Sequence, residues 1–173
     1  MKKYIILLRG INVSGKNKIQ MAALRQLLNE LNFQNVQTYI QSGNIVLDTE
    51  EDSTAVCQKI KKGIQDYFGL DIPVLARNIK EWSHVIENYP FPIENQKIVA
   101  FTFLNTVSKE TSIAIKNSGE DQYKIVNDVM YLYCPTGFAR TKLTNNVIEK
   151  KLNVIATTRN LRTTLKLLEL ATI

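Results

Sequence analysis

Short apolar runs alternate with amphipathic stretches through the first half of the chain. Strand patterns cover residues 3–9, 36–42, 44–48 and 72–77, and helix patterns cover 21–31 and 56–68. The helix patterns repeat apolar residues every three or four positions, whereas the strand patterns are short runs rich in β-branched and aromatic residues. Gly43 separates two strand patterns and predicts a tight hairpin turn. The resulting order β-α-β-β-α-β is typical of the split βαβ, or ferredoxin-like, unit.

The second half partly repeats this order after a short helix around 80–88 and a Pro90-Phe91-Pro92 break. The pattern predicts strands at 97–104, 122–126 and 129–134, a weak helix at 108–117, and helices at 146–152 and 163–170. We therefore expect an α+β protein of two ferredoxin-like subdomains with antiparallel or mixed sheets, the second lacking its final strand. The predicted boundaries are 1–78, a connecting segment 79–95, and 96–173, which ends in basic helices.

Composition is that of an ordinary globular protein, with 173 residues, 45% apolar and 22% charged. The apolar run Tyr4–Leu8 is too short for a membrane span or a signal-peptide core, so we expect a cytoplasmic protein without membrane contact. Cys57, Cys134 and the single histidine His84 form no disulfide framework or ligand cluster. No metal or cofactor is therefore expected, and the oligomeric state is not predicted.

The formal net charge of +6 is concentrated near the C-terminus. Residues 139–173 contain seven basic side chains and only two acidic ones, a net charge of +5. A clustered basic face attracts phosphate groups, and this attraction weakens with added salt. The alternative is an ordinary solvated helical surface.

Hydrogen-bonding side chains follow two strands that the split βαβ topology makes parallel. The C-terminal ends of these strands meet at one sheet edge, so the loop Gly10–Lys18 should lie beside the Gly43 turn. The candidate anion-binding residues at this edge are Arg9, Asn12, Lys16, Asn17, Gln41, Ser42 and Asn44. Arginine, lysine and amide groups together suit a phosphate. The alternative is that the asparagines and Ser42 hold the two loops by bonding the backbone.

The segment from Gly10 to Asn17, GINVSGKN, is close to the P-loop pattern G-x-x-x-x-G-K-[ST]. Asn17 lacks the hydroxyl group that binds magnesium in a P-loop. Asp48, which would take the place of the magnesium-binding aspartate, ends the return strand of a predicted hairpin, whereas a P-loop requires a parallel sheet. These features argue against a true P-loop and leave a looser phosphate-binding loop open.

Four unusual sequence words carry a resemblance to a known family: residues 8–17, LRGINVSGKN; residues 39–44, YIQSGN; residues 141–146, TKLTNN; and residues 156–160, ATTRN. The chain resembles, over essentially its whole length, the bacterial domain-of-unknown-function 1697 family. This resemblance implies an α+β protein of two ferredoxin-like subdomains, and it confers no activity. It also suggests that one functional surface with the N-terminal loops includes Lys142, Thr144, Asn145, Arg159 and Asn160.

Three functional hypotheses follow. The first is a binding module for a phosphate-bearing ligand, either a nucleotide or a nucleic acid, with Arg9 and Lys16 supplying charge and Arg159 closing the site. The second is an enzyme that acts on a phosphorylated small molecule at the same edge and stabilises charge electrostatically. The third is a protein-interaction domain without a ligand, which would expose an apolar patch.

Overall fold

The computed structural model describes residues 1–173 and divides into two compact units. Unit 1 contains Met1–His84 together with Lys166–Ile173, and unit 2 contains Val85–Leu165. None of the helices combines the length and the hydropathy that a membrane crossing requires.

Unit 1 is built on a four-stranded antiparallel sheet. Its elements are β1 (Lys2–Leu8), α1 (Met21–Glu30), β2 (Gln34–Tyr39), β3 (Asn44–Thr49), α2 (Ser53–Phe68), β4 (Val74–Asn78) and α3 (Ile79–Glu87), which continues into unit 2. The strand order is β2-β3-β1-β4, with every neighbouring pair antiparallel. Because β3 lies between β1 and β2, those two strands are parallel to each other, as the sequence pattern predicts.

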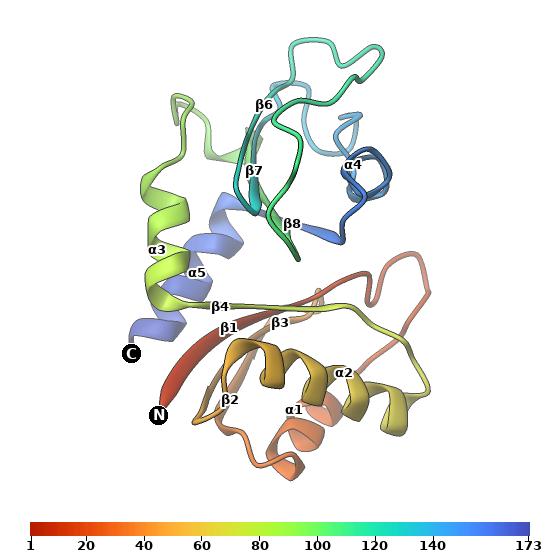
Figure 1. The fold of residues 1–173 in the computed structure, drawn as a ribbon, viewed down its shortest axis with the longest axis vertical. Helices are drawn as coiled ribbons and strands as arrows, with labels where there is room; N and C mark the ends of the chain where they lie inside the picture. Colours follow the sequence, from red (N-terminus) through yellow and green to blue (C-terminus); the bar gives the residue numbers. More distant parts are fainter. The chain divides into compact units, whose positions relative to one another are not determined.

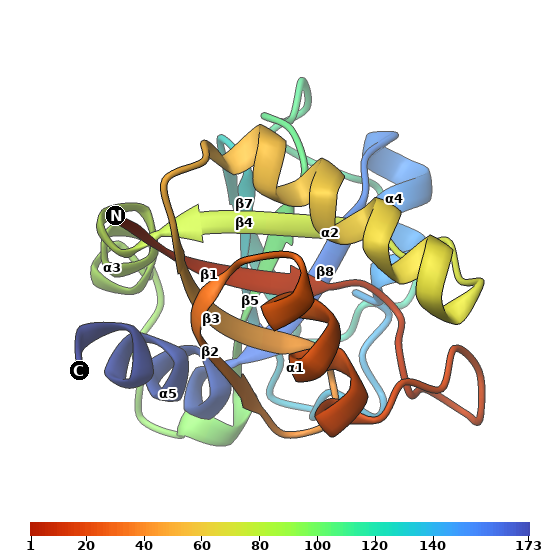
Figure 2. The ribbon, with the colours of Figure 1, turned by 90° about the horizontal axis from the view of Figure 1, so that it is seen from below.

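Helices α1 and α2 both cover one face of this sheet (Figures 1 and 2). The predicted apolar stripe of α1 is confirmed, since Leu24 and Leu28 are fully buried against the sheet. Burial of each such leucine stabilises the fold by about 1.5–3 kcal/mol. The acidic residue Asp52 is the N-cap of α2, and its carboxylate accepts a hydrogen bond from the Ala55 N–H at 2.9 Å. The apolar faces of both helices therefore determine which side of the sheet they cover.

The turn between β2 and β3 requires glycine at position 43. Gly43 has φ +81°, and a Cβ atom there would lie 2.6 Å from the Leu8 Cβ. The Leu8 N–H donates to the Gly43 carbonyl at 2.8 Å, which holds the two segments together. The predicted strand 36–42 is too long, because Ile40 adopts a left-handed conformation with φ 49° and is half exposed. An apolar side chain at a turn made this end look like a strand.

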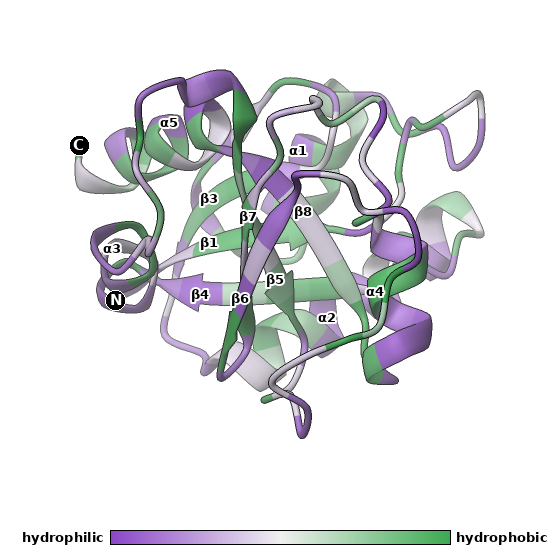
Figure 3. Ribbon diagram, turned by 90° about the horizontal axis from the view of Figure 1, so that it is seen from above, coloured by the Kyte–Doolittle hydropathy of each residue, from purple (hydrophilic) through white to green (hydrophobic).

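Unit 2 contains a second four-stranded antiparallel sheet. Its elements are the 3-10 helix η1 (Gln96–Ile98), β5 (Val99–Leu104), β6 (Gln122–Val126), β7 (Val129–Tyr133), α4 (Asn145–Leu152), β8 (Ala156–Asn160) and the start of α5 (Leu161–Thr172). The order is β6-β7-β5-β8, again with antiparallel neighbours. Figure 3 shows that the inner strand β5 is predominantly hydrophobic. The α+β class of the chain is thus confirmed.

The prediction that the second unit lacks its final strand is wrong, because β8 pairs with β5. The strand was missed because its sequence, ATTRN, contains few apolar residues. Strand β8 is an edge strand with one strand neighbour, and polar residues are common in such strands.

The predicted helix at 108–117 is also wrong, because this segment contains no helix. Ile113 and Ile115 both pack against the core, although side chains two positions apart point away from each other on a helix. The Tyr123 hydroxyl accepts from the Ile113 N–H and donates to the Ile113 carbonyl, both at 2.8 Å. These bonds satisfy the backbone without helical hydrogen bonds. One face of the unit 2 sheet is therefore covered by a single helix, α4, and by irregular segments that contribute side chains to the core.

We expect Gly43→Ala to destabilise the protein more than Gly69→Ala. Both glycines have positive φ, where alanine costs about 1–2 kcal/mol, but only Gly43 has atoms within 4 Å of the new methyl group. The overlap with Leu8 should raise the total loss for Gly43→Ala to about 3 kcal/mol or more. Urea unfolding followed by circular dichroism measures both, and equal losses would contradict this account of the turn.

Candidate functional site

Asn12 ties the loop Gly10–Lys18 to the turn that precedes β3. Its side-chain Nδ2 donates to the carbonyl of Gln41 at 2.8 Å and to that of Ile19 at 2.9 Å. Its Oδ1 accepts from the Ile19 N–H at 2.9 Å. The loop therefore lies beside the Gly43 turn, as the strand order predicts. All three bonds go to backbone atoms, so this amide shapes the loop.

The other predicted amides at this edge also bind within the protein. Asn17 Nδ2 donates to the Gly10 carbonyl at 2.9 Å. Asn44 is fully buried, and its Nδ2 donates to the Tyr39 carbonyl at 3.1 Å and to the Ser42 hydroxyl at 2.8 Å. These groups hold the two loops, which is the structural alternative that the sequence left open. The side chain of Gln41 is exposed, and Arg9 is half-buried.

The tip of the loop is a tight turn that projects from unit 1 (Figure 2). The Lys16 N–H donates to the Val13 carbonyl at 2.9 Å, and the two residues between them, Ser14 and Gly15, have φ 50° and 75°. Positive φ at both central positions is the signature of a type I′ turn. Since the tip is a hairpin turn and β3 is antiparallel to β1, this segment is not a P-loop.

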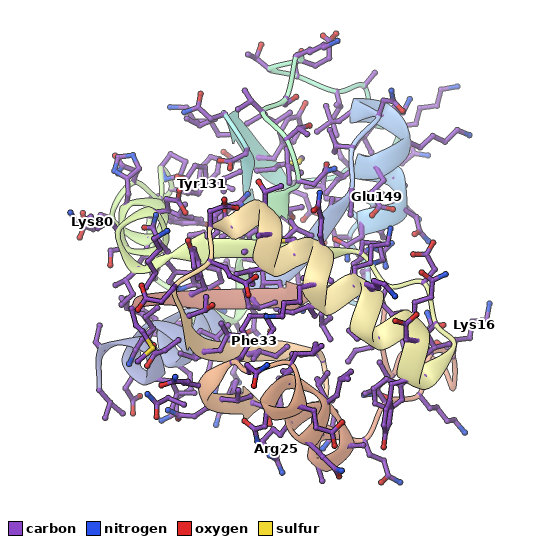
Figure 4. The ribbon with its side chains drawn as sticks, turned by 60° about the horizontal axis from the view of Figure 1, so that its bottom comes forward. Lys16, Arg25, Phe33, Lys80, Tyr131 and Glu149 are labelled. Carbon is purple, nitrogen blue, oxygen red and sulfur yellow. The ribbon has the colours of Figure 1, made fainter.

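Several groups that can bind an anion have no hydrogen-bond or ion-pair partner at this tip. Lys16 and Lys18 are exposed and form no ion pair, and Lys16 points away from the ribbon in Figure 4. The backbone N–H groups of Ser14 and Gly15 donate to no acceptor in the protein. Lys18 is not among the residues predicted from the sequence, although its position two residues after Lys16 in a polar loop indicates a second exposed cation.

Three of the predicted C-terminal residues line a cavity of about 370 Å³ in unit 2. Thr144 and Asn145 reach it from the start of α4, and Asn160 from the end of β8. The complete lining is Ala100, Leu132, Phe138, Thr141, Leu143, Thr144, Asn145, Thr158 and Asn160. Lys142 is exposed and is absent from this lining.

Arg159 faces the other side of the sheet. Side chains alternate along a strand, and its neighbours Thr158 and Asn160 both line the cavity. The guanidinium group donates to the Thr157 hydroxyl at 2.8 Å and to the Thr158 carbonyl at 3.0 Å, and the residue is only 8% exposed. The structure therefore brings together three of the five C-terminal candidates and places Lys142 and Arg159 apart from them.

The positive charge of the C-terminal segment is divided among different environments. Lys150 and Lys151 lie in the last turn of α4, where a cation interacts favourably with the helix dipole. Lys166 forms an ion pair with Glu169 at 2.7 Å, and Arg159 is buried. The excess of positive charge in the C-terminal segment is therefore not one exposed basic face, because some of these cations stabilise a helix end, form an ion pair or are buried.

A chain of hydroxyl groups that the sequence did not predict supports the cavity wall. The fully buried Thr102 lies with its Oγ1 2.7 Å from that of Thr158, and Thr158 donates to Asn145 Oδ1 at 2.7 Å. Because the Thr158 hydroxyl has one hydrogen, Thr102 is the donor in the first bond. The threonines at 102 and 158 resembled ordinary strand residues, and only their pairing in the register of β5 and β8 joins them.

Neither cysteine supplies a reactive thiolate near neutral pH. Burial raises the pKa of the Cys57 thiol and that of the Cys134 thiol to about 11 each. The nearby Arg77 lowers the Cys57 pKa, and the Thr141 hydrogen bond lowers that of Cys134, but burial is the larger effect at both positions. No group of three or more histidine, cysteine, aspartate or glutamate side chains could hold a metal ion.

These observations define a two-unit α+β protein with a protruding basic loop in one unit and a polar-walled cavity in the other. The chain belongs to the family described as "Protein of unknown function (DUF1697)", which matches residues 1–131. Its fold is similar to that of the conserved bacterial protein SP0830 from Streptococcus pneumoniae, with 22% sequence identity, a TM-score of 0.70 and 98% of each chain covered. No curated protein matches the chain. The predicted family resemblance is confirmed.

We expect Asn12→Asp to loosen the loop Gly10–Lys18. The carboxylate keeps the acceptor for the Ile19 N–H but loses both donated bonds and faces two carbonyl oxygens. Hydrogen exchange measured by mass spectrometry should accelerate in peptides spanning this loop, with about 1–3 kcal/mol lost in unfolding free energy. Asn32→Asp is the matched control, because Asn32 also has positive φ and its side chain forms no hydrogen bond. Equal exchange in the two variants would refute the role of Asn12.

Thiol labelling at pH 8 should be slow. A thiol with a pKa of about 11 is about 0.1% thiolate at this pH, against roughly a quarter for a free cysteine with a pKa near 8.5. We expect labelling by dithiobisnitrobenzoate to be at least about 100-fold slower than in the urea-unfolded protein. Because the folded pKa values are raised, these thiols should also reduce stability as the pH rises from about 9 through 11. Rapid labelling of either thiol in the folded protein would contradict this assignment.

Proposed function

We propose that the protein binds a phosphate-bearing ligand through the tip of the loop Gly10–Lys18, and that this ligand is a nucleic acid strand. The observation that carries the proposal is a pair of unpaired exposed lysines, Lys16 and Lys18, on a loop that hydrogen bonds hold in place. The open backbone N–H groups of Ser14 and Gly15 add donors of the kind that bind phosphate oxygens.

The shape of the loop favours a polymer over a free nucleotide. The tip projects from the unit, and Val13 on it is 57% exposed. A convex turn contacts a ligand from one side, which suits the continuous phosphate backbone of a nucleic acid and provides no walls around a small molecule. The apolar Val13 side chain is also available to contact sugars or bases. A cytoplasmic location, which the proposal requires for contact with nucleic acid, stays a prediction.

The same loop explains how binding would avoid a large entropic cost. The bonds of Asn12 and Asn17 already hold the loop conformation before any ligand arrives. Preorganised donors lose less conformational freedom on binding than mobile ones. The amides of Asn12 and Asn17 would therefore contribute indirectly, by holding the lysines and the open N–H groups in place. The enzyme and the ligand-free interaction domain stay predictions that no observation tests.

The test is a fluorescence anisotropy titration with labelled single-stranded RNA, single-stranded DNA and duplex DNA. Lys16→Ala combined with Lys18→Ala should weaken binding about tenfold or more at low salt. On duplex DNA, the loss of two phosphate contacts should reduce the slope of log affinity against log salt by about 2. Unlabelled nucleoside triphosphates serve as competitors and should displace the polymer only weakly.

The matched control is Lys80→Ala combined with Lys124→Ala. Both of these lysines are exposed and form no ion pair, and Lys80 points outward from α3 in Figure 4. The control therefore removes the same charge from other surfaces. Equal weakening in the two double variants would show diffuse electrostatic attraction and reject the loop as the site. An absence of binding to every polymer at low salt would reject the proposal outright.

A further inference from the structure

The cavity in unit 2 has an apolar wall and a polar wall. Ala100, Leu132 and Leu143 are buried, Phe138 is half-buried, and together they form the apolar wall. Five threonine and asparagine residues supply the polar groups, and no charged side chain lines the space. A volume of about 370 Å³ lies within the usual range for small-molecule sites, which are mostly apolar with a few convergent polar groups.

The oxygen atoms of the polar wall already accept hydrogen bonds from the protein. Asn145 Oδ1 accepts from the Thr158 hydroxyl at 2.7 Å, and Asn160 Oδ1 accepts from the Thr163 N–H at 2.9 Å. The hydroxyl of Thr141 accepts from the Leu143 N–H at 3.1 Å. These bonds fix the orientation of each side chain, because the amide oxygens are held on the protein side.

Several hydrogen-bond donors of the same wall have no acceptor within the protein. The Nδ2 groups of Asn145 and Asn160 have no acceptor in the protein, and neither do the hydroxyl hydrogens of Thr141 and Thr144. The Thr144 hydroxyl instead accepts from the Val147 N–H at 3.4 Å. The polar wall therefore offers hydrogen-bond donors. A ligand group that donates, such as an ammonium, would meet oxygen atoms that already accept hydrogen bonds from the protein.

We propose that this cavity binds a small molecule that combines an apolar body with one oxyanion, a carboxylate or a phosphate. The apolar wall would bury the body, while the two amide Nδ2 groups and the threonine hydroxyls would donate to the oxyanion. No carboxylate lines the cavity to repel the anion. Asn145 is the first residue of α4 and Asn160 directly precedes α5, so the positive ends of both helix dipoles lie at this wall, where they favour an anion. This proposal uses residues of unit 2 alone and does not depend on the function proposed for the loop Gly10–Lys18.

The isosteric variant Asn145→Asp tests the donor wall. It keeps an oxygen for the Thr158 hydroxyl but replaces the Nδ2 donor with a negatively charged acceptor. The control Asn127→Asp adds the same charge in unit 2 at the exposed β6–β7 turn, where aspartate is also well tolerated. We expect Asn145→Asp to weaken binding at least tenfold and Asn127→Asp to change it by less than twofold.

The probes are 2-naphthoate, 2-naphthyl phosphate and the neutral isostere 2-naphthamide, titrated by ¹H–¹⁵N correlation spectroscopy on the full chain. Binding of either oxyanion should shift the amide signals of Thr144, Asn145 and Asn160, and the comparison of the two oxyanions identifies which one the cavity prefers. Naphthamide should bind at least tenfold more weakly. Naphthamide binding as tight as that of both oxyanions, or no shift from any probe at 10 mM, would overturn the proposal.

A second variant keeps the test decisive if Asn145→Asp unfolds. Ala100→Leu extends a side chain into the cavity from the apolar wall. If the cavity is open, this substitution should leave the melting temperature within a few degrees of the wild type and abolish probe binding. A large loss of stability would show that no space exists there, and unchanged probe binding would place the probe elsewhere. Either result would refute the proposed site.

Discussion

The hydrogen bonds that hold the chain in its fold use some polar atoms at each candidate site and leave others open. In unit 1, the amides of Asn12, Asn17 and Asn44 are used to satisfy backbone groups where two chain segments meet. What remains for a ligand is the set of groups that the loop does not need, namely the lysines and the N–H groups of its tip. In unit 2, the oxygens of Asn145 and Asn160 are used in the same way, and their hydrogens remain. Ligand binding at either proposed site would therefore depend on the polar groups that form no hydrogen bond within the protein.

The two units share a strand order but differ in how one sheet face is covered. In unit 1, α1 and α2 both pack against the β2-β3-β1-β4 sheet and form a continuous core. In unit 2, the crossover from β5 to β6 contains no helix, and Ile113 and Ile115 reach the core from an irregular segment. A single helix, α4, packs on this face and begins at the cavity. In unit 2, the face that is covered by one helix and an irregular segment also contains the cavity.

Neither cysteine supplies a reactive thiolate near neutral pH. Burial keeps the thiols of Cys57 and Cys134 protonated at neutral pH because desolvation disfavours the thiolate. Arg159, which looked available for ligand binding in the sequence, is buried with its guanidinium bonded to Thr157 and to the backbone. Binding through preorganised donors is consistent with these environments in each unit.

The sequence alone determined the local features that depend on periodicity and on residue type. The stripe of α1, the Gly43 turn and the proximity of the loop Gly10–Lys18 to that turn all follow from residue spacing and from the parallel arrangement of β1 and β2. Strand β8 and the irregular segment at 108–117 did not follow, because an edge strand can be polar and because two isoleucines can reach a core without a helix. Only the tertiary structure decided which atoms of each asparagine are already bonded within the protein, since the fold brings together the hydrogen-bond partners of Asn12, Asn145 and Asn160. The type of a residue does not reveal these partners.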